Sequence, residues 1–220
     1  MALAGPRVAE MEREEPAMPE QKSLALDPEP QSLEELNRLI AAAPPVVEGG
    51  TRAVLGEGPV GAAIAFVGEQ PGDQEDLQGR PFVGPAGQIF DRALAEAGIR
   101  REDSYVTNAV KHFKYVQRGK RRLHQRPTAG EVTHYRWWLK RELDLVGPRV
   151  VVALGATAVL ALAGRALPIN ANRGPARFDN RQGYITVHPS YLLRIPAEAE
   201  KRKAFLAFRR DLERIRALAA

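Results

Sequence analysis

The stretch that decides the fold is residues 62–72, which reads AAIAFVGEQPG. A short apolar run followed by Gly and Pro predicts a buried strand that ends in a tight turn. In open α/β sheets ligands bind beyond the carboxyl ends of the strands, so this turn would present Glu69 and Gln70 to a cleft. Taken alone, the stretch also has a plainer interpretation, in which its glycines serve only the geometry of a strand-to-helix connection.

The rest of the chain alternates predicted strands with predicted helices. Ser32 and Thr128 each open a capping box, the sequence pattern of a helix start. Further strands are expected at 104–110, 150–154 and 184–187, and further helices at 85–97, 128–146, 156–163 and 197–218. This alternation predicts an α/β fold, a three-layer αβα sandwich around a four-stranded, mainly parallel sheet. Residues 111–126 are expected to form an irregular basic loop.

Composition narrows the class of protein. The chain has 220 residues and no cysteine, which excludes disulfides and thiolate catalysis and argues against any cofactor held by cysteines. No segment approaches the roughly 18 apolar residues of a membrane span, and the N-terminus lacks an apolar signal core. We therefore expect a cytoplasmic monomer with a disordered acidic leader at 1–31 and one domain at 32–220.

Charge is distributed unevenly along the chain. Residues 1–35 hold nine acids and three bases, whereas residues 36–220 hold 29 bases and 18 acids. Residues 111–126 contain seven Lys or Arg and no acid, with Phe113 and Tyr115 among them. Cations neutralise phosphates and aromatic rings stack on bases, so this segment predicts nucleic-acid binding, with a merely solvated basic loop as the alternative.

Polar residues stand where the predicted strands end. Glu69 follows the first strand, Asn108 lies in the second and His188 follows the last. Because parallel strands end at one edge of a sheet, we expect this carboxylate, amide and imidazole to converge. An Asn amide near the ring of Phe82 can read the edge of a flat base, and an imidazole can donate to an anion that develops on it. Each residue alone has a structural interpretation, but together they indicate a site for an extruded base.

Four motifs carry a family resemblance. GEQPG at 68–72, PFVGPAG at 81–87, VTNAVKHFK at 106–114 and HPS at 188–190 resemble the uracil-DNA glycosylase superfamily, on the side of its family 4. The insert GKRRLH at 119–124 resembles the loop of the UdgX branch, whose members become covalently attached to uracil-containing DNA. The resemblance covers about residues 52–215 and implies the same αβα fold.

The resemblance also implies roles for individual residues. The main chain around Gln70 and the ring of Phe82 would hold uracil, and Asn108 would read its edge. His188 would hydrogen-bond the uracil carbonyl, and Glu69 would stabilise the cationic sugar. His124 would attack the sugar carbon. Asp73 would support this geometry, and the expected DNA contacts are Lys111, Lys114, Lys120, Arg121, Arg122 and Ser190.

Relatives of this kind usually hold a four-iron cluster on cysteines, and here the chain departs from the pattern. The two later ligand positions correspond to His112 and Tyr135. We therefore expect no cofactor and no metal, with packing by Tyr135, Trp137 and Trp138 against the basic loop in place of the cluster.

The sequence leaves three functions open. The first is uracil excision from DNA, preferably single-stranded, followed by covalent capture through His124. The second is a conventional glycosylase that turns over with water, and the third is a non-catalytic binder of uracil-containing DNA. The combination of Glu69, Asn108 and His188 argues against the third, because a binder needs no group directed at the anion of a leaving base.

Overall fold

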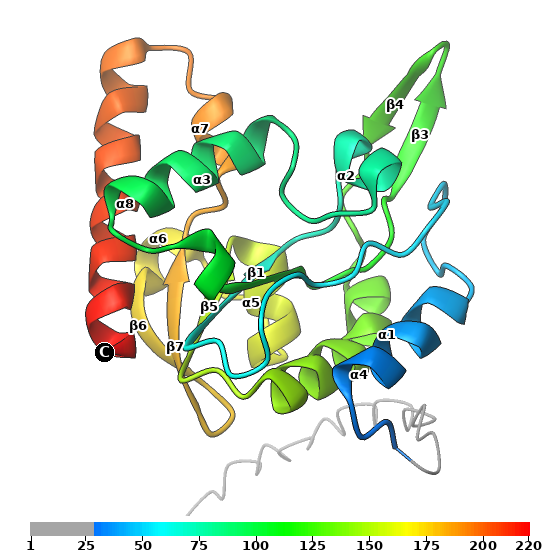
Figure 1. The fold of residues 1–220 in the computed structure, drawn as a ribbon. Coiled ribbons are helices and arrows are strands. Elements are labelled where there is room, and N and C mark those ends of the chain that lie inside the picture. The colour runs from blue at the N-terminus through cyan, green and yellow to red at the C-terminus, as the bar shows by residue number, and fades with distance from the viewer. Residues whose placement is uncertain (1–28) are drawn as a thin grey trace, which may run out of the picture.

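The computed structural model describes residues 29–220 (Figure 1). Most of the predicted leader at 1–31 lies outside the described residues, so its disorder stays a prediction. From α1 (Leu33–Ala42) to α8 (Glu198–Ala219), helices and strands are interspersed along the chain. None of the described helices combines the length and the apolar composition needed to cross a membrane.

A five-stranded sheet in the order β2-β1-β5-β7-β6 forms the centre of the protein. Its strands are β1 (Ile64–Gly68), β2 (Tyr105–Asn108), β5 (Val150–Leu154), β6 (Gly174–Phe178) and β7 (Arg181–Thr186). The four parallel strands are those that the sequence predicts, which confirms the α/β class. The predicted number of four is wrong, because β6 pairs antiparallel with β7 at the edge. With Pro175 and Arg177 in a five-residue stretch, β6 has an edge-strand composition that weakens its apolar signal.

Helices cover both faces of the sheet, so every residue of β1 is buried. Ala65 and Val67 belong to the core cluster on the side of α1, α4 (Ala129–Val146) and α5 (Ala156–Ala163). Ile64 and Phe66, which alternate with them, belong to the cluster on the side of α3 (Pro85–Glu96) and α8. This two-residue alternation produces the three-layer αβα arrangement.

Both predicted capping boxes open helices where expected. The Ser32 hydroxyl accepts the N–H of Glu35 at 3.1 Å at the start of α1. At the start of α4, Thr128 accepts the N–H of Glu131 at 3.3 Å, and the Glu131 carboxylate accepts the Thr128 N–H at 2.6 Å. These side chains satisfy backbone donors that a helix start leaves free.

Residues 111–126 are not the irregular loop that the sequence predicts. Strands β3 (Tyr115–Arg118) and β4 (Arg121–His124) pair antiparallel in a hairpin, which turns at Gly119 with a φ of 59°. Figure 1 shows this hairpin extending from the body beside α2 (Asp73–Gln78). Four other short elements were not predicted: α2, η1 (Arg101–Asp103), α6 (Ile169–Asn172) and α7 (Ser190–Leu193).

Candidate active site

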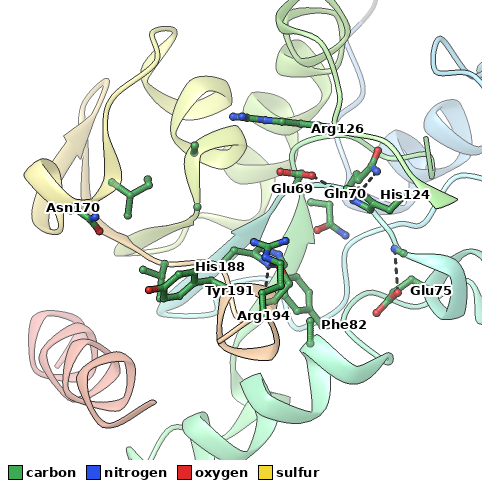
Figure 2. Close-up of a pocket in the computed structure, with 18 residues that line it drawn as sticks. Glu69, Gln70, Glu75, Phe82, His124, Arg126, Asn170, His188, Tyr191 and Arg194 are labelled. Atoms are coloured by element: carbon green, nitrogen blue, oxygen red, sulfur yellow. Dashed lines mark hydrogen bonds and ion pairs between the residues drawn. The ribbon is translucent and has the colours of Figure 1, made fainter. Parts of the chain in front are cut away.

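A cavity of about 810 Å³ opens at the carboxyl ends of the parallel strands. Glu69 follows β1, Asn108 ends β2 and His188 comes shortly after β7, and all three line the cavity. Gln70, Phe82 and His124 line it as well. In Figure 2, Glu69, Gln70 and His124 lie on one side, and His188 and Phe82 lie on the other. The structure thus brings these predicted residues to one cavity, while their roles stay predictions.

Glu69 is held between the sheet and the hairpin. Its Oε2 accepts a hydrogen bond from the hydroxyl of Thr157, in the first turn of α5, at 2.7 Å. Its Oε1 lies 3.4 Å from Nε2 of His124, at the end of β4. The side chain is 24% exposed, so the carboxylate combines a fixed position with access to the cavity. Such a group can stabilise a positive charge that develops on a bound sugar.

The side chain of Gln70 anchors the base of the hairpin. Its Oε1 accepts the N–H of Lys114, just before β3, at 3.1 Å. Its Nε2 lies 2.9 Å from the carbonyl oxygen of Gln125 and 2.9 Å from Nε2 of His124. Because a backbone N–H only donates and a carbonyl only accepts, these contacts fix the orientation of the amide. Because an amide nitrogen only donates, its contact with His124 needs a lone pair on the imidazole Nε2, the tautomer that carries its ring proton on Nδ1.

Asn108 and Phe82 meet over Gly68. A side chain at Gly68 would overlap Oδ1 of Asn108 and lie 2.6 Å from Cζ of Phe82, so only glycine allows this approach. Asn108 is only 2% exposed, and its amide makes no hydrogen bond to another side chain or backbone group within residues 29–220. Both its donor and its acceptor therefore remain available to a ligand, beside an aromatic ring on which a base can stack.

His188 is neutral and presents a donor. Its Nδ1 accepts the backbone N–H of Ser190 at 3.1 Å, so the ring proton is on Nε2. Burial, with a smaller contribution from the positive charge of Arg194, lowers the pKa of His188 to about 4. The ring centroids of His188 and Phe82 are 5.7 Å apart. A neutral imidazole with an Nε2–H can stabilise a developing oxyanion without adding a full charge to the pocket.

Arg122 fastens the hairpin to α2. Its guanidinium donates to Asp73 Oδ1 at 2.6 Å and to Asp76 Oδ2 at 2.5 Å. It also lies over the rings of Phe113 and Tyr115, at 5.4 and 5.2 Å from their centroids. Asp73, predicted to support the substrate, is not among the residues that line the cavity, and its carboxylate instead contacts the hairpin. Arg122 is thus engaged within the protein rather than displayed to solvent.

The predicted DNA contacts divide by exposure. The prediction that Lys111 contacts DNA is wrong, because its side chain is fully buried. Its ammonium donates to Glu142 Oε2 at 2.5 Å, to the Thr107 hydroxyl at 2.7 Å and to the Asn108 carbonyl at 3.0 Å. Lys114 is mostly buried and pairs with Glu131 at 2.9 Å. Two predicted cations, Lys120 and Arg121, are exposed at the hairpin turn, and Ser190 lines the cavity.

Sequence reasoning missed several residues on the cavity wall. Arg126 and Arg194 are exposed and approach the cavity from opposite sides in Figure 2. Neither cation forms an ion pair within the part of the chain that the structure describes. Tyr191, 46% exposed, and Asn170 extend the wall beyond Phe82 and Asn108. The basic run up to 126 contained a signal for Arg126, but nothing local to α6 or α7 indicated the other three.

The residues at the expected cluster position do not fit an iron–sulfur cluster. The chain has no cysteine thiolates, and Nδ1 of His112 lies 2.7 Å from the hydroxyl of Tyr135. Tyr135 also accepts the N–H of Val46 at 3.4 Å, so this contact joins three separate segments. Burial raises the pKa of Tyr135 to about 12. Within residues 29–220 no three His, Asp or Glu side chains are grouped as metal ligands. Trp138 belongs to the same buried cluster as Tyr135, and Trp137 packs against that cluster, so their role in place of the iron–sulfur cluster stays a prediction.

The fold and the site together define a class, an αβα domain whose parallel strands end at a pocket suited to a planar, hydrogen-bonding ring. The chain belongs to the uracil DNA glycosylase superfamily, whose family model matches residues 55–213. It is 39% identical over 168 residues to a type-4 uracil-DNA glycosylase of Thermotoga maritima, covering 71% of this chain and 84% of that protein. A type-4 uracil-DNA glycosylase of Pyrobaculum aerophilum is 37% identical over 154 residues, 66% of this chain and 75% of that protein.

Proposed function

We propose that this protein excises uracil from DNA and that His124 then bonds to the sugar. Family membership supports the first part, because the similar proteins from Thermotoga maritima and Pyrobaculum aerophilum are uracil-DNA glycosylases by name. The observation that carries the second part is the position of His124, with Nε2 at 3.4 Å from Glu69 Oε1 on the wall of the base cavity.

Excision begins with an extruded uracil stacked on Phe82. The free donor and acceptor of Asn108 pair with the edge of uracil, and cytosine presents the opposite pattern there. When the N-glycosidic bond breaks, its electron pair stays with the uracil ring. The Nε2–H of neutral His188 donates to the carbonyl oxygen that carries this charge, and the carboxylate of Glu69 stabilises the cationic sugar.

Capture follows from the tautomer of His124. Its Nε2 lone pair, oriented by the Gln70 amide, forms a bond to the sugar carbon as the hydrogen bond to Gln70 is lost. The imidazolium so formed loses its Nδ1 proton to solvent, and the uracil anion takes a proton from solvent, so the protons balance. A half-exposed ring, at 48%, permits that transfer. Free uracil leaves, and the DNA remains attached.

Single-stranded DNA is the proposed substrate, because extrusion from a single strand avoids the few kcal/mol of unpairing. The experiment mixes the protein with a uracil-containing single strand and separates the products on a denaturing gel. A shifted band that survives boiling supports capture. An alkali-labile strand without a shift would support a conventional glycosylase, and an unmodified strand would support binding alone.

A second histidine, His134, provides a matched control for His124. His124→Ser should abolish the shifted band and keep some uracil release, because Glu69, Asn108 and His188 are untouched. His134→Ser replaces an exposed histidine of α4 and should leave the shifted band intact. If His124→Ser removed uracil release as well as the adduct, His124 would shape the pocket rather than attack the sugar.

A further inference from the structure

The carboxylate of Glu75, in α2, connects the two loops that form the base pocket. Its Oε2 accepts the backbone N–H of Gly72 at 3.0 Å, and its Oε1 accepts the N–H of Gly84 at 2.8 Å. Gly72 ends the loop that contains Gln70, and Gly84 closely follows Phe82. We propose that Glu75 is a positioning residue that sets the spacing between these two loops and thereby the affinity for uracil. This inference rests on the proposed glycosylase function.

Both glycines leave room for this carboxylate. A Cβ at Gly72 would lie 2.7 Å from Oε2 of Glu75, and a Cβ at Gly84 would lie 3.2 Å from Oε1. Glu75 itself is only 9% exposed. Hydrogen bonds from backbone N–H groups to a carboxylate are strong, and they strengthen when water is excluded. The packing on both sides is therefore adapted to one buried acceptor that holds two donors from different loops.

The loop of Phe82 needs such support. Phe82 has a φ of 55°, and Asp179 is the other non-glycine residue with a positive φ within residues 29–220. A strained conformation of this kind persists only where surrounding contacts impose it. The guanidinium of Arg101 donates to the Pro81 carbonyl at 2.7 Å, which fixes one end of the loop. Glu75 fixes the other end at Gly84, two residues beyond the ring on which the base would stack.

Glu75 differs from an ordinary capping residue. In α4, the capping Glu131 accepts the N–H of Thr128 from its own helix start and pairs with the Lys114 side chain. Glu75 uses one oxygen for the start of α2 and the other for the backbone of a second loop. Loss of either contact breaks the connection between the two loops, which lets the pocket widen and also lowers stability. The inhibition constant of free uracil separates these effects, because it does not depend on the fraction of protein that is active.

The experiment measures single-turnover uracil release in the presence of increasing free uracil. Glu75→Gln keeps the shape but replaces one acceptor with an amide donor, which cannot pair with an N–H. Its uracil inhibition constant should rise about 10- to 100-fold, as expected when a binding group moves by roughly 1 Å. Glu35→Gln is the matched control, because Glu35 accepts the N–H of Gln31 at the start of α1, which is separate from the cavity.

The outcomes separate this inference from the proposed function. No uracil release by the unaltered protein would refute the glycosylase activity itself. Release by the unaltered protein, with an unchanged uracil inhibition constant in Glu75→Gln, would overturn the role of Glu75 alone. If Glu75→Gln does not fold, Gly84→Ala tests the same contact, because the added Cβ crowds Oε1 of Glu75 and leaves Glu75 itself unchanged. A rise in the uracil inhibition constant of Gly84→Ala, smaller than the rise expected for Glu75→Gln, then supports the proposal. No rise overturns it.

Discussion

The floor and one wall of the cavity are built by different means. The floor consists of strand ends, where the parallel ladder of β1, β2, β5 and β7 fixes the backbone of Asn108 and of the residues next to Glu69 and His188. The wall consists of the β3–β4 hairpin, which the side chains of Gln70 and Arg122 attach to the body. Backbone pairing is cooperative and buried, whereas a few polar side chains can be removed one at a time. The comparison predicts that the proposed capture, which would depend on the hairpin, is separable from the proposed recognition of the base.

The largest effect, on the free energy of unfolding, is expected for Lys111, which lies beneath the strand ends of the floor. Lys111→Met would leave the fully buried carboxylate of Glu142 without its cation, and removing one partner of a buried pair costs about 3–5 kcal/mol. The free energy of unfolding, measured in urea, should fall by that amount. Because Lys111 also donates to the Asn108 carbonyl, selection of uracil should weaken with it.

A double variant controls this experiment. Lys111→Met with Glu142→Gln removes both charges and keeps an acceptor for the hydroxyls of Tyr105 and Thr107. It should regain much of the lost free energy of unfolding, because no unpaired charge remains buried. Equal instability of the single and the double variant would mean that packing, rather than charge, makes Lys111 important.

An effect of intermediate size, mainly on the yield of adduct, is expected at Arg122, where the hairpin contacts α2. Arg122→Gln removes the ion pairs with Asp73 and Asp76, and hydrogen bonds between charged groups contribute about 1.5–3 kcal/mol. The yield of adduct on a denaturing gel should fall more than the rate of uracil release. Equal loss of both activities would mean that floor and wall are not separable.

The floor could be predicted from the sequence because each of its residues stands at the end of a predicted strand or just after it. Local patterns identified the strand ends at Glu69, Asn108 and His188, and one edge of a parallel sheet brought them together. The burial of Lys111 could not be predicted, since its partner Glu142 lies 31 residues along the chain, on α4. Within a basic run, Lys111 has the same local pattern as the exposed Lys120.

The hairpin was missed for a related reason. Its strands are four residues long and carry Arg118, Arg121 and Arg122, so the apolar alternation reduces to Val116 opposite Leu123. Four-residue strands give little periodicity, and the charges indicated a loop. Only the turn at Gly119, with a short β-prone stretch before it, could have indicated a hairpin. The contacts that hold it, Gln70 and Arg122, are tertiary and leave no local pattern.

The smallest effect is expected at the exposed turn of the hairpin. Lys120→Ala and Arg121→Ala each remove one exposed cation from a segment without acids. Each phosphate contact on a single strand contributes about 0.7 to the slope of log affinity against log salt, so each variant should make that slope shallower by about this amount. Arg38→Ala, which removes an exposed cation from α1, serves as the control and should leave the slope unchanged. An unchanged slope in both hairpin variants would mean that neither cation contacts a phosphate. Arg126 and Arg194, on the cavity wall, would then be the next cations to replace.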